Sequence, residues 1–150
     1  MRISSFFIWI CLIQAFISCS PSSDLEGLPE MDRKTKVRFN QYYRDGRVLY
    51  QNYCVSCHME NGEGLKNLIP SLANSPIFRR AMETVPCQIK YGSEEHANAP
   101  SGPQMVSFRS LSPLEIAEIT TYISSSWGNK HGLMDVKEVK TLLDSCQINQ

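Results

Sequence analysis

The apolar positions of the chain recur mainly at steps of three and four residues, the spacing of an amphipathic helix. The clearest run comprises Ile116, Ile119, Thr120, Ile123 and Trp127. Directly before it, Ser112-Pro113-Leu114-Glu115 has the form of a capping box with proline at the first helical position. The pattern predicts a largely buried helix that starts at Ser112 and that Gly128 ends.

Two further helices are predicted. The first starts near Asp45, runs through residues 48–53 into the segment 54–58, and is ended by Gly62 and Gly64. The last covers Val136 to Leu143, where apolar residues again have helical spacing. No segment shows sustained alternation of apolar and polar residues, so we expect an all-α fold.

The N-terminus has the features of a secretory signal. Arg2 precedes a mostly apolar segment, residues 6–17, which is too short to span a bilayer. Phe16-Ile17-Ser18-Cys19 resembles a bacterial lipobox, which implies cleavage before Cys19 and its lipidation. The alternatives are ordinary cleavage near Ser18 or an uncleaved anchor helix.

These features divide the chain into three parts. We predict a signal peptide over residues 1–18, a lipid-anchored flexible tether over 19–40 and a folded domain over 41–150. The domain is expected on the periplasmic side of a bacterial membrane, attached through the lipid.

The pentapeptide Cys54-Val55-Ser56-Cys57-His58 is typical of covalent haem attachment. One helical turn would bring both thiols to the porphyrin edge and place His58 as an axial ligand. A thioredoxin-like redox pair would need a βαβ setting, which the flanks lack. A zinc site would need a second spaced pair of ligands, and no such pair is present in the sequence. We therefore predict one covalent haem c.

Six cysteines occur in the chain. Cys11 would leave with the signal, Cys19 would carry lipid, and Cys54 and Cys57 would bind haem. Cys87 and Cys146 remain, and an even remainder outside the cytoplasm suggests a disulfide between them. Two separate thiols are the alternative, since sequence does not show whether the Cα atoms approach closely enough.

Charge adds little beyond one basic run. Lys and Arg together number 15, as do Asp and Glu, so nothing favours nucleic-acid binding. The run consists of Arg33, Lys34, Lys36, Arg38, Arg44 and Arg47. It is read either as a solvated face or as a docking patch for an acidic partner or anionic headgroups.

Taken in order, the motifs resemble the class I c-type cytochromes with a single haem. They are Gly46-Arg47-Val48-Leu49-Tyr50, Cys54 to His58, Gly62-Glu63-Gly64-Leu65, Pro70-Ser71-Leu72-Ala73, Met105-Val106-Ser107-Phe108, the helix 111–123 and Ser126-Trp127-Gly128-Asn129. The resemblance covers about residues 43–143 and implies a cytochrome c fold. The Trp-Gly-Asn ending is similar to a subgroup fused or partnered to periplasmic oxidoreductases.

The resemblance also implies residue roles. The Pro70 carbonyl would accept a hydrogen bond from His58, and Met105 would be the second axial ligand. Gly46 and Tyr122 would meet where two helices cross. Val106 and Ser71 stand where the family commonly has proline. Other candidate ligands are Met59, Met82, Met134 and His96, and an apolar shell is expected from Tyr50, Leu68, Leu72, Phe78 and Phe108.

A haem iron with histidine and methionine ligands has no open position and suits electron transfer. We therefore expect an electron carrier, not an enzyme, that works with a redox partner protein such as an oxidase, reductase or dehydrogenase. A five-coordinate sensor or enzyme subunit is the alternative if Met105 does not bind iron. Permanent docking on an oxidoreductase is a third reading, which stable co-purification would distinguish.

Overall fold

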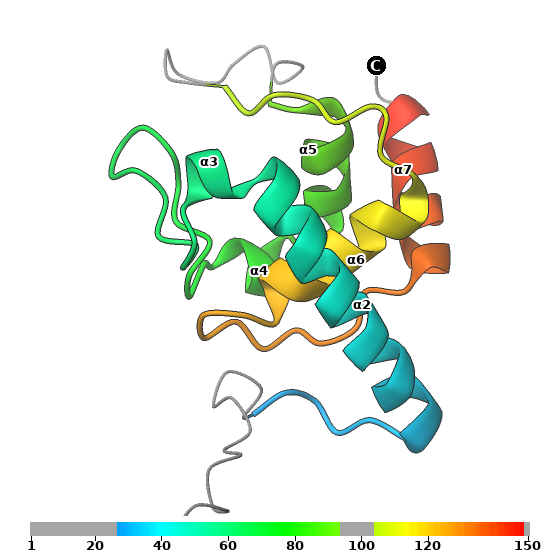
Figure 1. The fold of residues 1–150 in the computed structure, drawn as a ribbon. Helices are drawn as coiled ribbons and strands as arrows, with labels where there is room; N and C mark the ends of the chain where they lie inside the picture. The colour runs from blue at the N-terminus through cyan, green and yellow to red at the C-terminus, as the bar shows by residue number, and fades with distance from the viewer. Residues whose placement is uncertain (1–26, 94–103, 149–150) are drawn as a thin grey trace, which may run out of the picture.

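The computed structural model describes residues 27–93 and 104–148, which form helices around one core (Figure 1). The helices are α2 (Arg33–Tyr53), α3 (Val55–His58), α4 (Ile77–Arg80), the 3₁₀ helix η3 (Met82–Thr84), α5 (Val85–Tyr91), α6 (Pro113–Ser124) and α7 (Val136–Ile148). Within these ranges, β-type pairing is limited to an isolated bridge between Leu65 and Ile69. The all-α prediction is confirmed.

Helix α2 begins at Arg33, so the predicted start near Asp45 is wrong, as is the extension of the tether through residue 40. The Asp32 side chain caps the helix by accepting hydrogen bonds from the backbone N–H groups of Lys34 and Thr35. The start of the helix was not recognised in the sequence because its first turns are mostly basic. Only Phe39 and Tyr42 are buried there, too few to show a helical pattern of apolar residues. The predicted signal peptide and Cys19 lie outside the described residues.

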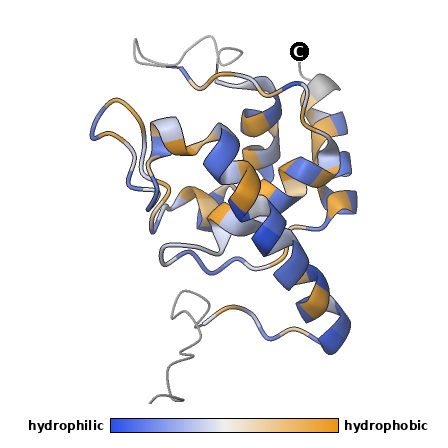
Figure 2. Ribbon diagram, viewed as in Figure 1, coloured by the Kyte–Doolittle hydropathy of each residue, from blue (hydrophilic) through white to orange (hydrophobic). Residues whose placement is uncertain are grey.

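The N-terminal half of α2 is mostly hydrophilic (Figure 2). Arg38 pairs with Asp135 in the loop before α7, while Arg33, Lys34, Lys36, Arg44 and Arg47 are exposed. Most of the basic run is therefore exposed on the surface of α2, as both the solvated-face and the docking-patch readings require. Among the described residues, no helix combines the length and the apolar character needed to cross a bilayer.

Helix α2 crosses α6 (Figure 1), and the contacts of Gly46 with α6 place this residue at the crossing. A Cβ atom on Gly46 would lie 2.0 Å from the Glu118 carbonyl oxygen and 3.0 Å from the Tyr122 Cβ. Only a residue without a side chain permits this approach. The structure thus places Gly46 and Tyr122 together at a helix crossing, as the resemblance implied.

Helix α6 has the predicted capping box. The Ser112 hydroxyl accepts from the Glu115 N–H at 3.3 Å, and the Glu115 carboxylate accepts from the Ser112 N–H at 2.8 Å. The helix ends at Ser124, not at Gly128. The Asn129 side chain explains the early end, because its amide donates to the Ile123 carbonyl at 2.8 Å and to the Leu72 carbonyl at 2.7 Å.

Helix α7 extends to Ile148, five residues beyond the predicted end at Leu143. The added residues include Cys146, which the structure joins to Cys87 of α5 by a disulfide with a Cα–Cα distance of 6.1 Å. The described part of the chain therefore links α5 covalently to its last helix. Such a link closes a long loop and reduces the entropy of the unfolded chain.

Substituting Gly46→Ala should lower the free energy of unfolding by about 3 kcal/mol, because the new methyl group meets backbone atoms of α6 that cannot rotate away. Urea denaturation of the haem-loaded protein measures the change. Val48→Ala on the exposed side of the same helix is the control and should change stability by less than about 0.5 kcal/mol. Equal stability of the two variants would contradict the tight crossing.

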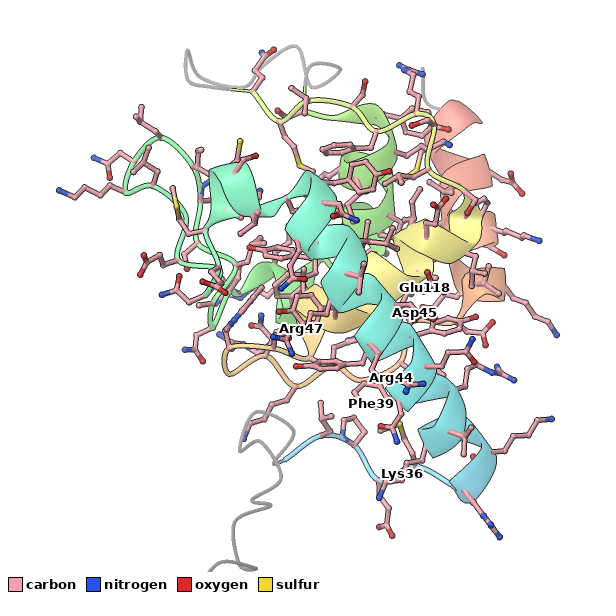
Figure 3. All side chains as sticks on the ribbon, viewed as in Figure 1. Lys36, Phe39, Arg44, Asp45, Arg47 and Glu118 are labelled. Atoms are coloured by element: carbon pink, nitrogen blue, oxygen red, sulfur yellow. A yellow bond between two sulfur atoms is a disulfide. The ribbon has the colours of Figure 1, made fainter. Side chains whose placement is uncertain are left out.

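Glu118 lies beside Asp45 at this crossing (Figure 3). Burial, followed by the nearby carboxylates of Asp45 and Glu115, raises the pKa of Glu118 from 4.5 to about 7. A raised carboxyl pKa favours the folded state below the ordinary value, and this stability is lost as pH rises from about 4.5 to 7. Glu118→Gln should remove that slope.

The effect should be on the order of 1 kcal/mol, since solvent near the helix surface screens the carboxylates. Urea midpoints of the wild type and Glu118→Gln, measured across this pH range, test the prediction. The two proteins should differ more at neutral pH than at pH 4, with the variant the more stable at neutral pH. A constant difference would show that Glu118 does not titrate there.

Candidate functional site: a haem pocket

The Cys54-Val55-Ser56-Cys57-His58 motif forms one helical turn. The α2 helix breaks at Cys54, and α3 begins at the next residue. The Cys54 carbonyl then accepts from the His58 N–H at 2.9 Å, which closes the turn. The helix ends at His58 because Met59 adopts a left-handed conformation with φ of 64°, so the predicted end at Gly62 and Gly64 is three or more residues too late.

His58 faces a largely apolar cavity of about 250 Å³. Its walls come from the motif, the 70–78 segment, α5, α6 and the segment before α6. They comprise Tyr50, Cys54, His58, Pro70, Ser71, Leu72, Ser75, Pro76, Ile77, Phe78, Val85, Gln88, Ile89, Met105, Ile119 and Ile123. An apolar cavity with one imidazole, one thiol and one thioether on its wall fits a haem group.

The Pro70 carbonyl orients the His58 ring. His58 Nδ1 lies 3.3 Å from that carbonyl oxygen, so Nδ1 carries the proton and donates it. The lone pair is then on Nε2, the nitrogen available to a metal. Burial lowers the pKa of His58, while the bond to Pro70 acts in the opposite direction. Burial thus favours the neutral imidazole, the form that binds iron.

The two cysteines of the motif form no disulfide and lie in environments that differ. Cys54 is buried, and this burial, followed by the charge of Cys57, raises the pKa of its thiol to about 12. Cys57 is exposed and lies outside the lining of the cavity. Within the described residues no group of three or more His, Cys, Asp or Glu side chains could hold a metal ion.

Met105 is the methionine that the structure places on the cavity wall with His58. Met82 and Met134 are buried in the core but outside that lining. The Met59 carbonyl accepts from the Tyr50 hydroxyl at 2.6 Å, and its side chain does not line the cavity either. His96 lies outside the described residues. Of the described candidates for second ligand, Met105 has the best position.

Comparison with known protein families agrees with this geometry. The family model for cytochrome c matches residues 43–127, more than half of the chain. The chain belongs to the cytochrome c family. Haem c is its cofactor, and the cytochrome c fold predicted from the motifs is confirmed.

Three curated relatives are similar to the cytochrome. Each is described as the cytochrome c subunit of alcohol dehydrogenase (quinone). The proteins of Gluconacetobacter polyoxogenes and Komagataeibacter europaeus are each 31% identical over 105 residues, covering 67% of this chain and 22% of the relative. That of Gluconobacter oxydans (strain 621H) is 28% identical over 102 residues, covering 65% and 21%. The cytochrome thus spans about a fifth of their length.

The predicted apolar shell of the haem is correct in part. Tyr50, Leu72 and Phe78 line the cavity, whereas Leu68 is 55% exposed and Phe108 packs against Tyr53, with ring centroids 5.8 Å apart. Both residues lie on segments without regular structure, where hydrophobicity alone does not determine which way a side chain points. The lining residues that sequence reasoning missed are Ser75, Pro76, Ile77, Val85, Gln88, Ile89, Ile119 and Ile123. Helical spacing marked the last two as core but did not show which core surface they form.

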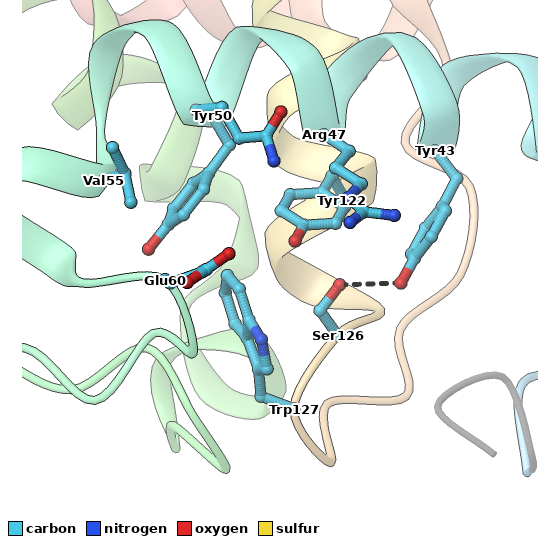
Figure 4. A pocket seen from close by; sticks show the side chains of 9 residues that line it. Tyr43, Arg47, Tyr50, Val55, Glu60, Tyr122, Ser126 and Trp127 are labelled. Atoms are coloured by element: carbon cyan, nitrogen blue, oxygen red, sulfur yellow. Dashed lines mark hydrogen bonds between the residues drawn. The ribbon is translucent and has the colours of Figure 1, made fainter. Parts of the chain in front are cut away.

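Tyr50 lines both this cavity and a second one of about 240 Å³, which Figure 4 shows. The ring centroids of Tyr50, Tyr122 and Trp127 lie 5.1–5.4 Å apart in pairs, and Tyr43 contacts Tyr122 at 5.1 Å. The Ser126 hydroxyl bonds to the Tyr43 hydroxyl at 3.1 Å. These aromatic contacts hold the C-terminal part of α2, which leads into the haem-binding turn, against α6 and Trp127.

Each thiol of the motif should form its own covalent bond to haem. Cys54→Ala or Cys57→Ala alone should leave haem attached through the other sulfur, while the double variant should lose all haem on denaturing gels stained for haem. Cys87→Ala with Cys146→Ala is the control and should retain the full haem stain. Haem retained by the Cys54, Cys57 double variant would contradict the assignment.

Proposed function

We propose that the cytochrome is a one-electron carrier on the periplasmic side of a bacterial membrane, relaying electrons between respiratory or periplasmic oxidoreductases. The observation that supports this most directly is the cavity with His58 and Met105 both on its wall. Haem c supplies a one-electron couple when bound in such a site. Two protein ligands would leave the iron no open position, which favours electron transfer over catalysis.

The residues around the cavity suit this role. Pro70 holds the His58 ring in one tautomer and orientation, and the apolar side chains of α5 and α6 exclude water. A thioether favours the ferrous state and raises the reduction potential. Because the walls belong to packed helices, little rearrangement should accompany a change of charge, and transfer should be fast.

Redox partner proteins follow from the same proposal. The relatives are cytochrome subunits of a dehydrogenase, which favours a dehydrogenase as one partner of this cytochrome. Whether partner binding is transient or permanent is distinguished by purification at moderate salt. A free carrier should separate from its partner, whereas a docked subunit should remain bound.

Membrane attachment through lipidated Cys19 belongs to the proposal as well. Because α2 begins at Arg33, the segment between Cys19 and the helix is shorter than predicted. The exposed cations of α2 are then close in sequence to the lipid, where they could approach anionic headgroups. Cys19→Ala should move the protein from the membrane fraction to the soluble fraction.

The ligand assignment is tested by Met105→Leu, which keeps the volume of the side chain but removes the sulfur. The ferric wild type should show the far-red methionine-to-iron absorption band, and the ferrous protein should not bind carbon monoxide. Met105→Leu should lose the band and bind carbon monoxide.

Met82→Leu is the matched control, because Met82 is a buried methionine outside the cavity lining, and its spectra should equal those of the wild type. If the wild type already binds carbon monoxide, the iron is five-coordinate. The second candidate function, a haem sensor or enzyme subunit, then replaces the electron carrier.

A further inference from the structure

We propose that Ser93 is a positioning residue for the distal ligand, holding the backbone of Met105 so that its sulfur stays at the haem. This inference rests on the proposed function, in which Met105 ligates the iron. Ser93 lies just after α5, and Met105 follows it twelve positions later in the sequence.

Two hydrogen bonds join the two residues. The Met105 N–H donates to the Ser93 hydroxyl oxygen at 2.6 Å, and the Ser93 N–H donates to the Met105 carbonyl at 3.0 Å. Both polar backbone groups of Met105 are thereby bonded to one partner. The hydroxyl is essential to this arrangement, because the backbone of Ser93 supplies only the second bond.

The end of α5 makes further contacts with the segment that carries Met105. Gly92 has φ of 77°, and a Cβ atom there would lie 2.5 Å from the Met105 carbonyl oxygen. Further along, Phe108 N–H donates to the Ile89 carbonyl at 3.1 Å, and Lys90 Nζ donates to the Arg109 and Leu111 carbonyls at 2.6 and 2.7 Å. The segment that carries Met105 is therefore fastened to α5 at several points.

Helix α5 is itself well anchored. Val85 and Ile89 are buried and line the cavity, and Cys87 is joined to Cys146 of α7 by the disulfide. A ligand fastened to α5 is thus fastened to an element that already forms part of the cavity wall. Such support fixes a ligand more firmly than a loop alone.

The local sequence explains why the backbone of Met105 needs these hydrogen bonds. Met105 lies outside any helix, and the residue after it is Val106, which is 61% exposed. Proline at that position would limit the backbone by its fixed φ, and valine does not. Hydrogen bonds from Ser93 provide the restraint by other means.

The test uses the full-length haem-loaded protein in the ferric state, with imidazole as a competing ligand. Ser93→Ala should weaken the far-red band and raise the affinity for imidazole roughly three- to tenfold, the effect of losing one hydrogen bond. Ser93→Thr retains the hydroxyl and should restore the affinity to near that of the wild type. Ser110→Ala, at an exposed serine of the same segment, is the control and should have no effect.

The outcomes separate this proposal from the ligand assignment. If Met105→Leu loses the band but Ser93→Ala binds imidazole like the wild type, the role of Ser93 is overturned and the electron carrier stands. If Met105→Leu keeps the band, both the ligand assignment of Met105 and the role of Ser93 are overturned.

Hydrogen exchange of the wild type requires no variant to fold. The Met105 amide should be protected in the haem-loaded protein. Exchange at the rate of an unbonded amide would also overturn the role of Ser93.

Discussion

The close crossing of α2 and α6 at Gly46 is the constraint on which the rest of the molecule depends. Helix α2 leads directly into Cys54 and His58, while α6 provides Ile119 and Ile123 of the cavity wall. If a side chain at position 46 pushed the two helices apart, the cavity residues that follow α2 would move away from those on α6. One missing Cβ therefore sets the width of the haem site as well as the packing of the core.

The two sides of the haem site are held by different means. On the proximal side, a helical turn from Cys54 to His58 and the nearby Pro70 carbonyl form the geometry within a short stretch of chain. Met105, the proposed second ligand, instead depends on contacts between segments far apart in sequence, through α5 and the disulfide to α7. The position of His58 is thus determined by nearby residues in the sequence, whereas the position of Met105 depends on contacts across the whole fold.

This difference explains what the sequence could predict. The capping box at Ser112 and the haem motif are short-range signals, and each correctly predicted a helix at its position, although both helices end earlier than predicted. The start of α2 was missed because basic residues obscure the core positions Phe39 and Tyr42. Ser93 carried no signal at all, since an ordinary serine gains its role only when the Met105 segment folds back onto it.

The size of the cavity indicates how strongly the fold depends on the haem that fills it. An empty space of about 250 Å³ would cost as much as about 6 kcal/mol at roughly 24 cal/mol per Å³. That figure is comparable with the whole net stability of a domain, about 5–15 kcal/mol. The folded state therefore depends on the group that fills the cavity. Two thioether bonds to Cys54 and Cys57 would keep that group in place in either oxidation state, so the stability of the fold would not vary as electrons come and go.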